Sequence, residues 1–163
     1  MVIGGVAHLY QGDLDLGRVA IERLRHEDLG TDVAVEEFSY GAVAVAQRLE
    51  ELRPELLLLV GAKARGREAG SVDRRVLQPL PRAPVEAQAS IADAVTGYID
   101  MDLVLEVAQA LHALPRRVVT IEVEPANTDP SERLSPLAEA ALGQVIQIVH
   151  QELATTFVPN PRG

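Results

Sequence analysis

A run of five aliphatic residues, Leu56 to Val60, constrains the fold of this chain more than any other feature. A strand with that sequence is apolar on both faces, which is typical of a strand buried between two layers of helices in a parallel sheet. Pro54 stands just before the run and ends the helical pattern that precedes it, because proline cannot continue a helix. The run therefore predicts a central strand in a layered α/β domain.

Shorter aliphatic segments predict the remaining strands, and stretches with the helical spacing of apolar residues separate them. Segment 71–77 has arginines on one side, which favours an antiparallel strand near an edge. The alternation predicts one three-layer α/β domain over residues 1–153, phosphorylase/hydrolase-like, with a mixed, mostly parallel sheet flanked by helices. Strands are expected at 1–6, 32–38, 56–60, 71–77 and 118–123, and helices at 16–26, 41–52, 100–113 and 136–153.

Helix boundaries and breaks are also marked in the sequence. Asp100 or Asp102 is expected to cap the third long helix, and Ser135, followed by a proline, to cap the last one. The prolines within residues 78–98 predict an irregular segment that lies over the edge of the sheet. Residues 154–163 are expected to form a frayed tail.

Composition excludes several classes of function. The net charge of −9 disfavours nucleic acid and anionic membranes as partners, and aromatic residues make up only 3% of the chain. The absence of cysteine excludes thiolate catalysis and thiolate metal sites. No apolar run reaches about 18 residues, and the first residues lack the pattern of a secretory signal, so a cytoplasmic protein is expected. No resident cofactor is expected.

Four segments follow one another in a characteristic order. They are Gly5 to Gly17, then 36–41, then 60–63 together with 70–72, and finally 118–125 with the Leu134-Ser135-Pro136 turn and the helix after it. In this order and spacing they resemble the motifs of the hydrogenase maturation protease family, over roughly residues 2–150. The last segment is the best preserved.

This resemblance implies an endopeptidase fold that acts on the large subunit of a nickel-iron hydrogenase. In that family, three side chains contact nickel already inserted in the precursor, and a short C-terminal extension is then removed. The matching positions here are Leu14, Gly61 and Gly97, or Thr96 if the alignment shifts by one residue. None has a side chain that can bind a metal. The resemblance therefore implies a protein that engages a hydrogenase large subunit or its precursor without cutting it.

Other residues at the same end of the predicted sheet leave alternatives open. His8, Asp13 and Asp15 are candidates for a relocated metal site or an acid/base pair. Alternatively, one of these aspartates caps the first helix and His8 lies on a surface loop. The full predicted binding set is His8, Asp13, Asp15, Ser39, Tyr40, Gly61, Lys63 and Tyr98.

The basic residues after the central strand also admit two interpretations. Lys63, Arg65 and Arg67 either contact an acidic peptide or terminal carboxylate, or are solvated loop charges. Ser39 lacks the G-x-S-x-G context of a catalytic serine. Three functions remain in view: a non-catalytic partner of hydrogenase, an active endopeptidase with relocated ligands, and a structural subunit of a larger assembly.

Overall fold

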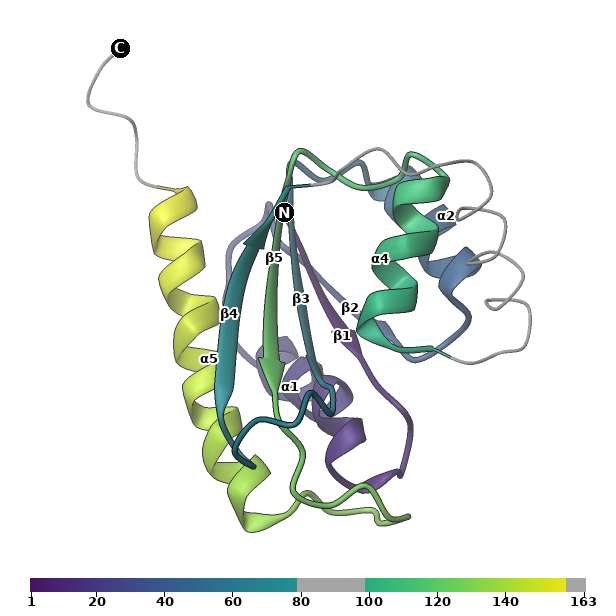
Figure 1. Ribbon diagram of the computed structural model, residues 1–163. Coiled ribbons are helices and arrows are strands. Elements are labelled where there is room, and N and C mark those ends of the chain that lie inside the picture. Colours follow the sequence, from purple (N-terminus) through teal and green to yellow (C-terminus); the bar gives the residue numbers. More distant parts are fainter. Residues whose placement is uncertain (79–98, 158–163) are drawn as a thin grey trace.

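The computed structural model describes residues 1–78 and 99–157, and its sheet has the order β2-β1-β3-β5-β4 (Figure 1). The pairs β2-β1, β1-β3 and β3-β5 are parallel, whereas β4 pairs with β5 in the antiparallel sense at the edge. The mixed, mostly parallel sheet and the antiparallel edge strand are both as predicted. The strands are β1 (Val2–Val6), β2 (Ala34–Phe38), β3 (Leu56–Ala62), β4 (Val72–Leu77) and β5 (Arg117–Val123).

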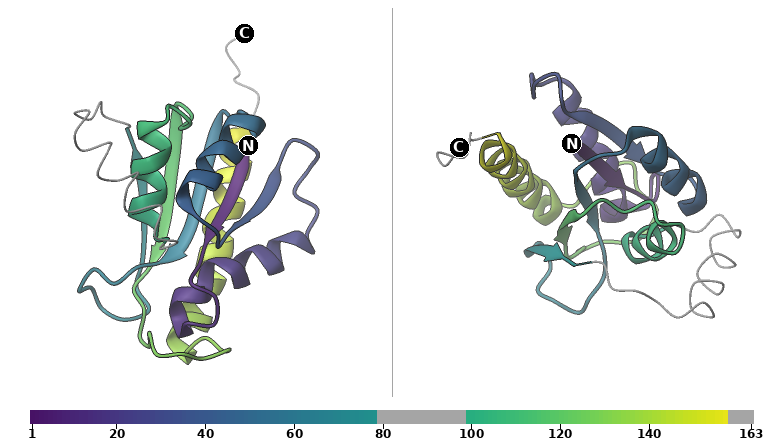
Figure 2. Two further views of the ribbon diagram at one scale, coloured as in Figure 1. Left: turned by 90° about the vertical axis from the view of Figure 1, so that its right-hand side faces the viewer. Right: turned by 90° about the horizontal axis from the view of Figure 1, so that it is seen from above.

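Helices cover both faces of the sheet, which confirms the three-layer architecture (Figures 1 and 2). One face packs against α2 and α4, and the other against α1 and α5. A short 3₁₀ turn, η1 (Gly12–Asp15), precedes α1. The helices are α1 (Leu16–Arg25), α2 (Ala42–Leu52), α4 (Met101–Ala110) and α5 (Pro136–Thr156).

The central strand β3 is buried on both sides, as its sequence predicts. Leu57 and Leu59 belong to the core beneath α2 and α4, whereas Leu56, Leu58 and Val60 belong to the core beneath α1 and α5. Each of these side chains is at most 3% exposed. Burial of aliphatic area on this scale is the main stabilising contribution in a domain with so few aromatic residues.

Helix α1 lies unusually close to β1, and a glycine makes this possible. A Cβ atom added to Gly17 would lie 2.1 Å from the carbonyl oxygen of Val6, closer than any side chain allows. The glycine that ends the first motif is therefore required for packing between the helix and the strand. It fixes where the chain enters α1, and hence the path of the preceding loop.

The predicted helix caps are confirmed. Asp100 accepts a hydrogen bond from the backbone N–H of Leu103, and Ser135 accepts one from that of Ala138. Helix α4 ends at Ala110, earlier than predicted, because His112 adopts a left-handed φ of 56°.

Two predicted segments fall largely outside the described residues. Helix α5 continues to Thr156, three residues past the predicted helix end at 153. The rest of the tail, 158–163, and the predicted irregular segment, apart from Gln78, lie outside the described residues.

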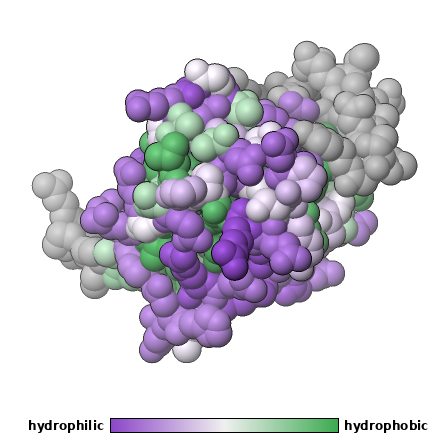
Figure 3. Space-filling model, turned by 90° about the horizontal axis from the view of Figure 1, so that it is seen from below, coloured by the Kyte–Doolittle hydropathy of each residue, from purple (hydrophilic) through white to green (hydrophobic). Residues whose placement is uncertain are grey.

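The carboxyl ends of the four parallel strands meet at the lower end of the molecule in Figure 1. In open α/β sheets this is the end where ligands bind. Seen from that end, apolar patches lie among hydrophilic side chains (Figure 3). No helix in the described part of the chain is long and apolar enough to cross a membrane.

Candidate functional site

The loop after β1 folds back on itself at the carboxyl end of the sheet. The backbone N–H of His8 donates to the carbonyl of Leu14 at 3.0 Å, and that of Gln11 donates to the carbonyl of His8 at 3.3 Å. The loop is also fastened to the segment between β5 and α5, since the N–H of Ser131 donates to the carbonyl of Tyr10 at 2.9 Å. Two loops far apart in sequence therefore form one rigid unit.

Asp13 is the residue that joins these loops. Its carboxylate is 0% exposed and accepts hydrogen bonds from the backbone N–H groups of Ala126 (2.8 Å) and Asn127 (2.9 Å). It also accepts from the backbone N–H (2.7 Å) and the hydroxyl (2.8 Å) of Ser135, the residue that caps α5. Asp13 therefore holds the start of the last helix in place.

These hydrogen bonds determine the protonation of Asp13. Burial by itself raises the pKa of the carboxyl, but the hydrogen bonds from Ser135, Asn127 and Ala126 together bring the pKa below its ordinary value. The group is thus ionised at neutral pH. Both carboxylate oxygens already accept protein hydrogen bonds, so binding a metal would require breaking some of them.

Asp15 is occupied in a different way. It is 2% exposed, and the guanidinium of Arg18 binds both carboxylate oxygens, with Nε 2.9 Å from Oδ1 and Nη2 2.5 Å from Oδ2. Asp15 stands at the N-cap position of α1, but its carboxylate binds the Arg18 side chain and accepts no capping hydrogen bond from the backbone of that helix. The interpretation that an aspartate caps the first helix therefore holds for the position of Asp15 but not for its side chain, and Asp13 binds the start of α5 instead.

The positions that match the family's metal contacts contain no donor side chain where the structure describes them. Leu14 is half-buried and aliphatic, and Gly61 is buried near the end of β3. A Cβ atom added to Gly61 would lie 2.9 Å from the sulfur of Met101 and 3.0 Å from the carbonyl oxygen of Val6. The first residue of α4 thus occupies the space that a longer side chain at position 61 would need.

The third matching position, Gly97 or Thr96, lies outside the described residues, as does Tyr98. Within the residues that are described, no group of three or more histidine, aspartate or glutamate side chains is placed to hold a metal ion.

The predicted residues after β2 are partly buried and interact locally. The Ser39 hydroxyl donates to the carboxylate of Glu37 at 2.7 Å. Tyr40 is 41% exposed, and its ring meets that of Phe38 edge-on at 6.3 Å between centroids. Burial, followed by the charge of Glu36, raises the pKa of Tyr40, so its hydroxyl stays protonated at neutral pH.

The basic residues after β3 bind carboxylates of the same chain, which differs from both interpretations of the sequence. The Lys63 ammonium contacts Asp100 and lies 3.4 Å from Asp102. Arg65 binds Asp102 and Glu122, each at 2.7 Å. These ion pairs connect the end of β3 to the start of α4 and to β5.

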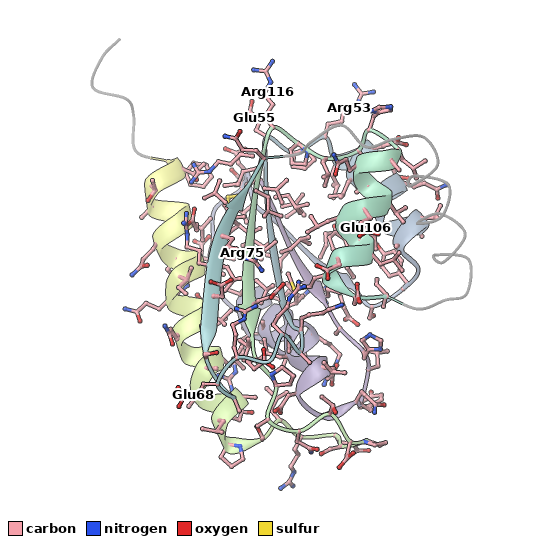
Figure 4. All side chains as sticks on the ribbon, in the orientation of Figure 1. Arg53, Glu55, Glu68, Arg75, Glu106 and Arg116 are labelled. Atoms are coloured by element: carbon pink, nitrogen blue, oxygen red, sulfur yellow. The ribbon has the colours of Figure 1, made fainter. Side chains whose placement is uncertain are left out.

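The buried carboxylate at the centre of this network, Glu122 on β5, was not among the predicted site residues. It is 2% exposed and also binds Arg67 at 2.5 Å, while Arg75 lies 3.6 Å away. Figure 4 shows Arg75 reaching from β4 across the sheet. An acidic residue inside an otherwise apolar strand was the one feature of the sequence that marked this position.

Those predicted site residues that the structure describes thus share one end of the sheet, and no group of three or more acidic or histidine side chains among them is placed to hold a metal ion. His8, Asp13 and Asp15 follow β1, Ser39 and Tyr40 follow β2, and Gly61 and Lys63 lie at the end of β3. Asp13, Asp15 and Lys63 each interact with residues of the same chain, and Gly61 has no side chain that could react or bind a ligand.

The fold is that of the hydrogenase maturation proteases. The [NiFe] hydrogenase maturation protease HycI from Thermococcus kodakarensis superposes with a TM-score of 0.65 at 19% identity, covering 94% of this chain and 91% of that one. The maturating endopeptidase HybD from E. coli gives a TM-score of 0.65 at 18% identity, over 96% and 93%. The hydrogenase 2 maturation peptidase from Thaumarchaeota archaeon SCGC_AB-539-E09 gives a TM-score of 0.64 at 20% identity, covering 93% of this chain and 96% of that one.

These similarities extend over nearly the whole length of both chains, so the resemblance read from the motifs is confirmed at the level of the fold. No protein-family model and no curated protein matches the sequence. The chain therefore combines the architecture of these proteases with a strongly diverged sequence.

Proposed function

We propose that this chain is a divergent hydrogenase maturation protease-like protein of the cytoplasm. It binds the large subunit of a nickel-iron hydrogenase, or the precursor of that subunit, and does not cleave it. Two observations support the choice of partner. The motifs follow the order of that family, and structures of proteins named as hydrogenase maturation proteases share the fold over more than nine-tenths of this chain.

The environment of Gly61 is the main support for the lack of cleavage. In the family that the motifs resemble, the carboxylate at this position contacts the nickel of the substrate. Here Met101 is 1% exposed, and its sulfur lies where that side chain would begin. Because the space has been refilled by an apolar side chain, the change at position 61 has been accommodated by its surroundings. Leu14 likewise provides no ligand.

An active endopeptidase with relocated ligands would need the carboxylates of Asp13 and Asp15. Releasing Asp13 would leave the backbone N–H groups of Ala126 and Asn127 without their acceptor, and releasing Asp15 would leave Arg18 without its main partner. These costs weigh against the relocated site. The other alternative, a purely structural subunit, would use the same fold without binding hydrogenase. A binding measurement distinguishes it from the proposed function.

The test uses the purified chain and the nickel-loaded large-subunit precursor of the [NiFe] hydrogenase from the same organism. We expect a stable complex by calorimetry and an unchanged precursor mass after prolonged incubation. An active maturation protease added to the same precursor is the positive control for cleavage. Removal of the extension at a catalytic ratio of this chain would refute the proposal, and absence of binding would favour the structural subunit.

A further inference from the structure

We propose that Leu9, Tyr10 and Tyr40, which we call the tyrosine tip, form the surface through which this chain contacts its protein partner. The complementary surface on the partner is an apolar pocket rimmed by basic side chains. This inference rests on the proposed function, because it assigns the contact to the same hydrogenase large subunit or precursor.

The tyrosine tip contains three of the six large hydrophobic side chains that are exposed among the described residues. Leu9 is 46% exposed, Tyr10 58% and Tyr40 41%. Strands β1 and β2 are parallel neighbours with Val6 opposite Phe38, so the residues just after them lie at the same edge of the sheet. In a chain with only three tyrosines and no tryptophan, two exposed tyrosines at this edge are notable, since aromatic residues dominate the binding energy of interfaces.

The backbone of Tyr10 adopts a conformation that is unusual for a tyrosine. Tyr10 is the third residue of the turn closed by the hydrogen bond between Gln11 and His8, and its φ is 58°. Glycine and asparagine adopt this left-handed conformation most readily, and tyrosine is disfavoured in it. A strained residue whose ring is mostly in solvent points to a role outside the fold.

The loop that carries Tyr10 is fastened by contacts within the chain. The carbonyl of Tyr10 accepts the N–H of Ser131, and the Gln11 side chain donates to the carbonyl of Thr128 at 2.7 Å. The Arg18 guanidinium lies 5.5 Å from the centre of the Tyr10 ring. A surface ordered in advance loses less entropy on binding, which favours affinity.

The charges around the tip determine the chemistry of the partner. Arg18 and Arg48 lie beside the two tyrosines, but the carboxylates of Asp15 and Glu36 bind them. Arg18 also pairs with Glu22 and Arg48 with Glu51, so each arginine is matched by two carboxylates. The loop that fastens Tyr10 carries the exposed side chains of Asp129, Glu132 and Arg133, so carboxylates outnumber cations around the tip. A basic rim on the partner complements this surface.

The test measures binding of the full chain to the nickel-loaded large-subunit precursor, with thermal unfolding measured in parallel. For Tyr10→Gly we expect binding to weaken at least tenfold while the melting temperature stays the same or rises, because glycine relieves the backbone conformation. For Tyr40→Ala and Leu9→Ser we expect weaker binding with little change in folding. Added salt should slow the association of the natural chain.

The matched control is Phe157→Ala. Phe157 is 50% exposed and lines a hollow at the opposite end of the sheet with Val2 and Leu56, so its loss should leave binding unchanged. If the natural chain binds and the tip variants bind equally well, the tyrosine tip is refuted while the proposed function stands. If the natural chain does not bind the precursor, both are refuted. If Tyr10→Gly fails to fold, the Tyr40 and Leu9 variants decide.

Discussion

Asp13 and Leu14 are adjacent in the chain, yet their side chains differ in surroundings, since that of Asp13 is buried and that of Leu14 is half-buried. Asp13 keeps the acidic residue of the family motif and accepts four hydrogen bonds from the loop and helix that end the fold. Leu14 stands where the family has a metal contact and has no such partners. The comparison teaches that the carboxylate of Asp13 fastens distant parts of the fold, whereas the aliphatic side chain of Leu14 can accept no hydrogen bond.

The same contrast holds between Asp13 and the pair formed by Gly61 and Met101. Around Asp13 every donor is matched by an acceptor, so its replacement leaves buried polar groups unsatisfied. Around Gly61 the space beside the glycine is filled by an apolar side chain, because the sulfur of Met101 lies 2.9 Å from where a Cβ atom would be. The variants below test whether Asp13 supports the fold and whether Met101 fills the space beside Gly61.

The largest effect is expected for Asp13→Ala. The buried donors of Ala126, Asn127 and Ser135 would lose their acceptor, which should lower the free energy of unfolding by about 3 kcal/mol. Urea denaturation measures this value. Asp13→Asn retains one acceptor oxygen and should cost less, and Leu14→Ala should cost less still. Equal effects at positions 13 and 14 would contradict the distinction between the two residues.

Gly61→Asp is expected to lower the free energy of unfolding by about 2 kcal/mol, because the new side chain meets Met101 and the carbonyl of Val6. The double variant Gly61→Asp with Met101→Ala removes the first of these clashes. Its loss of stability should be smaller than the combined losses of the single variants by at least about 1 kcal/mol. Simple additivity would show that Met101 does not fill the space at position 61.

The decrease in the free energy of unfolding at acidic pH should depend on Asp13. Its folded-state pKa is lowered, so its contribution is complete above the unfolded value of 3.8 and is lost as pH falls through the folded-state pKa. In that window the natural chain should lose up to about 1.4 kcal/mol per pH unit more than Asp13→Asn. Urea titrations between neutral pH and strongly acidic pH give the two slopes. Parallel slopes would mean that Asp13 titrates alike in both states.

The smallest effect is expected for Leu14→Glu. Position 14 is half-buried, so an ionised side chain there can reach water and should change the free energy of unfolding by less than about 1 kcal/mol. The change restores one acidic residue of the family motif but leaves Met101 in place, so the precursor's mass should remain unchanged. Cleavage by this single variant would show that a carboxylate at position 61 is not needed for cleavage of the precursor.

Local patterns predicted the fold well, and contacts between distant segments account for what was missed. The apolar run of β3 and the cap formed by Ser135 are encoded in a few neighbouring residues, and both are confirmed. That Met101 fills the space at Gly61 depends on how α4 meets β3, which no local pattern reports. The left-handed backbone of Tyr10 was missed for a similar reason, since a tyrosine gives no sequence mark of that conformation.

The sequence predicted where the candidate site residues lie, but it did not predict which residues they contact. The expected residues do lie at the carboxyl end of the sheet, but the bonds of Asp13 and the ion pairs of Lys63 join segments far apart in sequence. Their partners could be known only once the loops were positioned in space.

The antiparallel edge strand β4 has a consequence for the behaviour of this protein in solution. An uncovered strand edge can pair with another copy and begin aggregation, and charged side chains are a common protection. Arg74 and Arg75 both project from β4, with Arg74 bound to the buried Glu152 of α5 and Arg75 to Asp73. Charged side chains on β4 therefore disfavour the pairing of this edge with the same edge of a second copy.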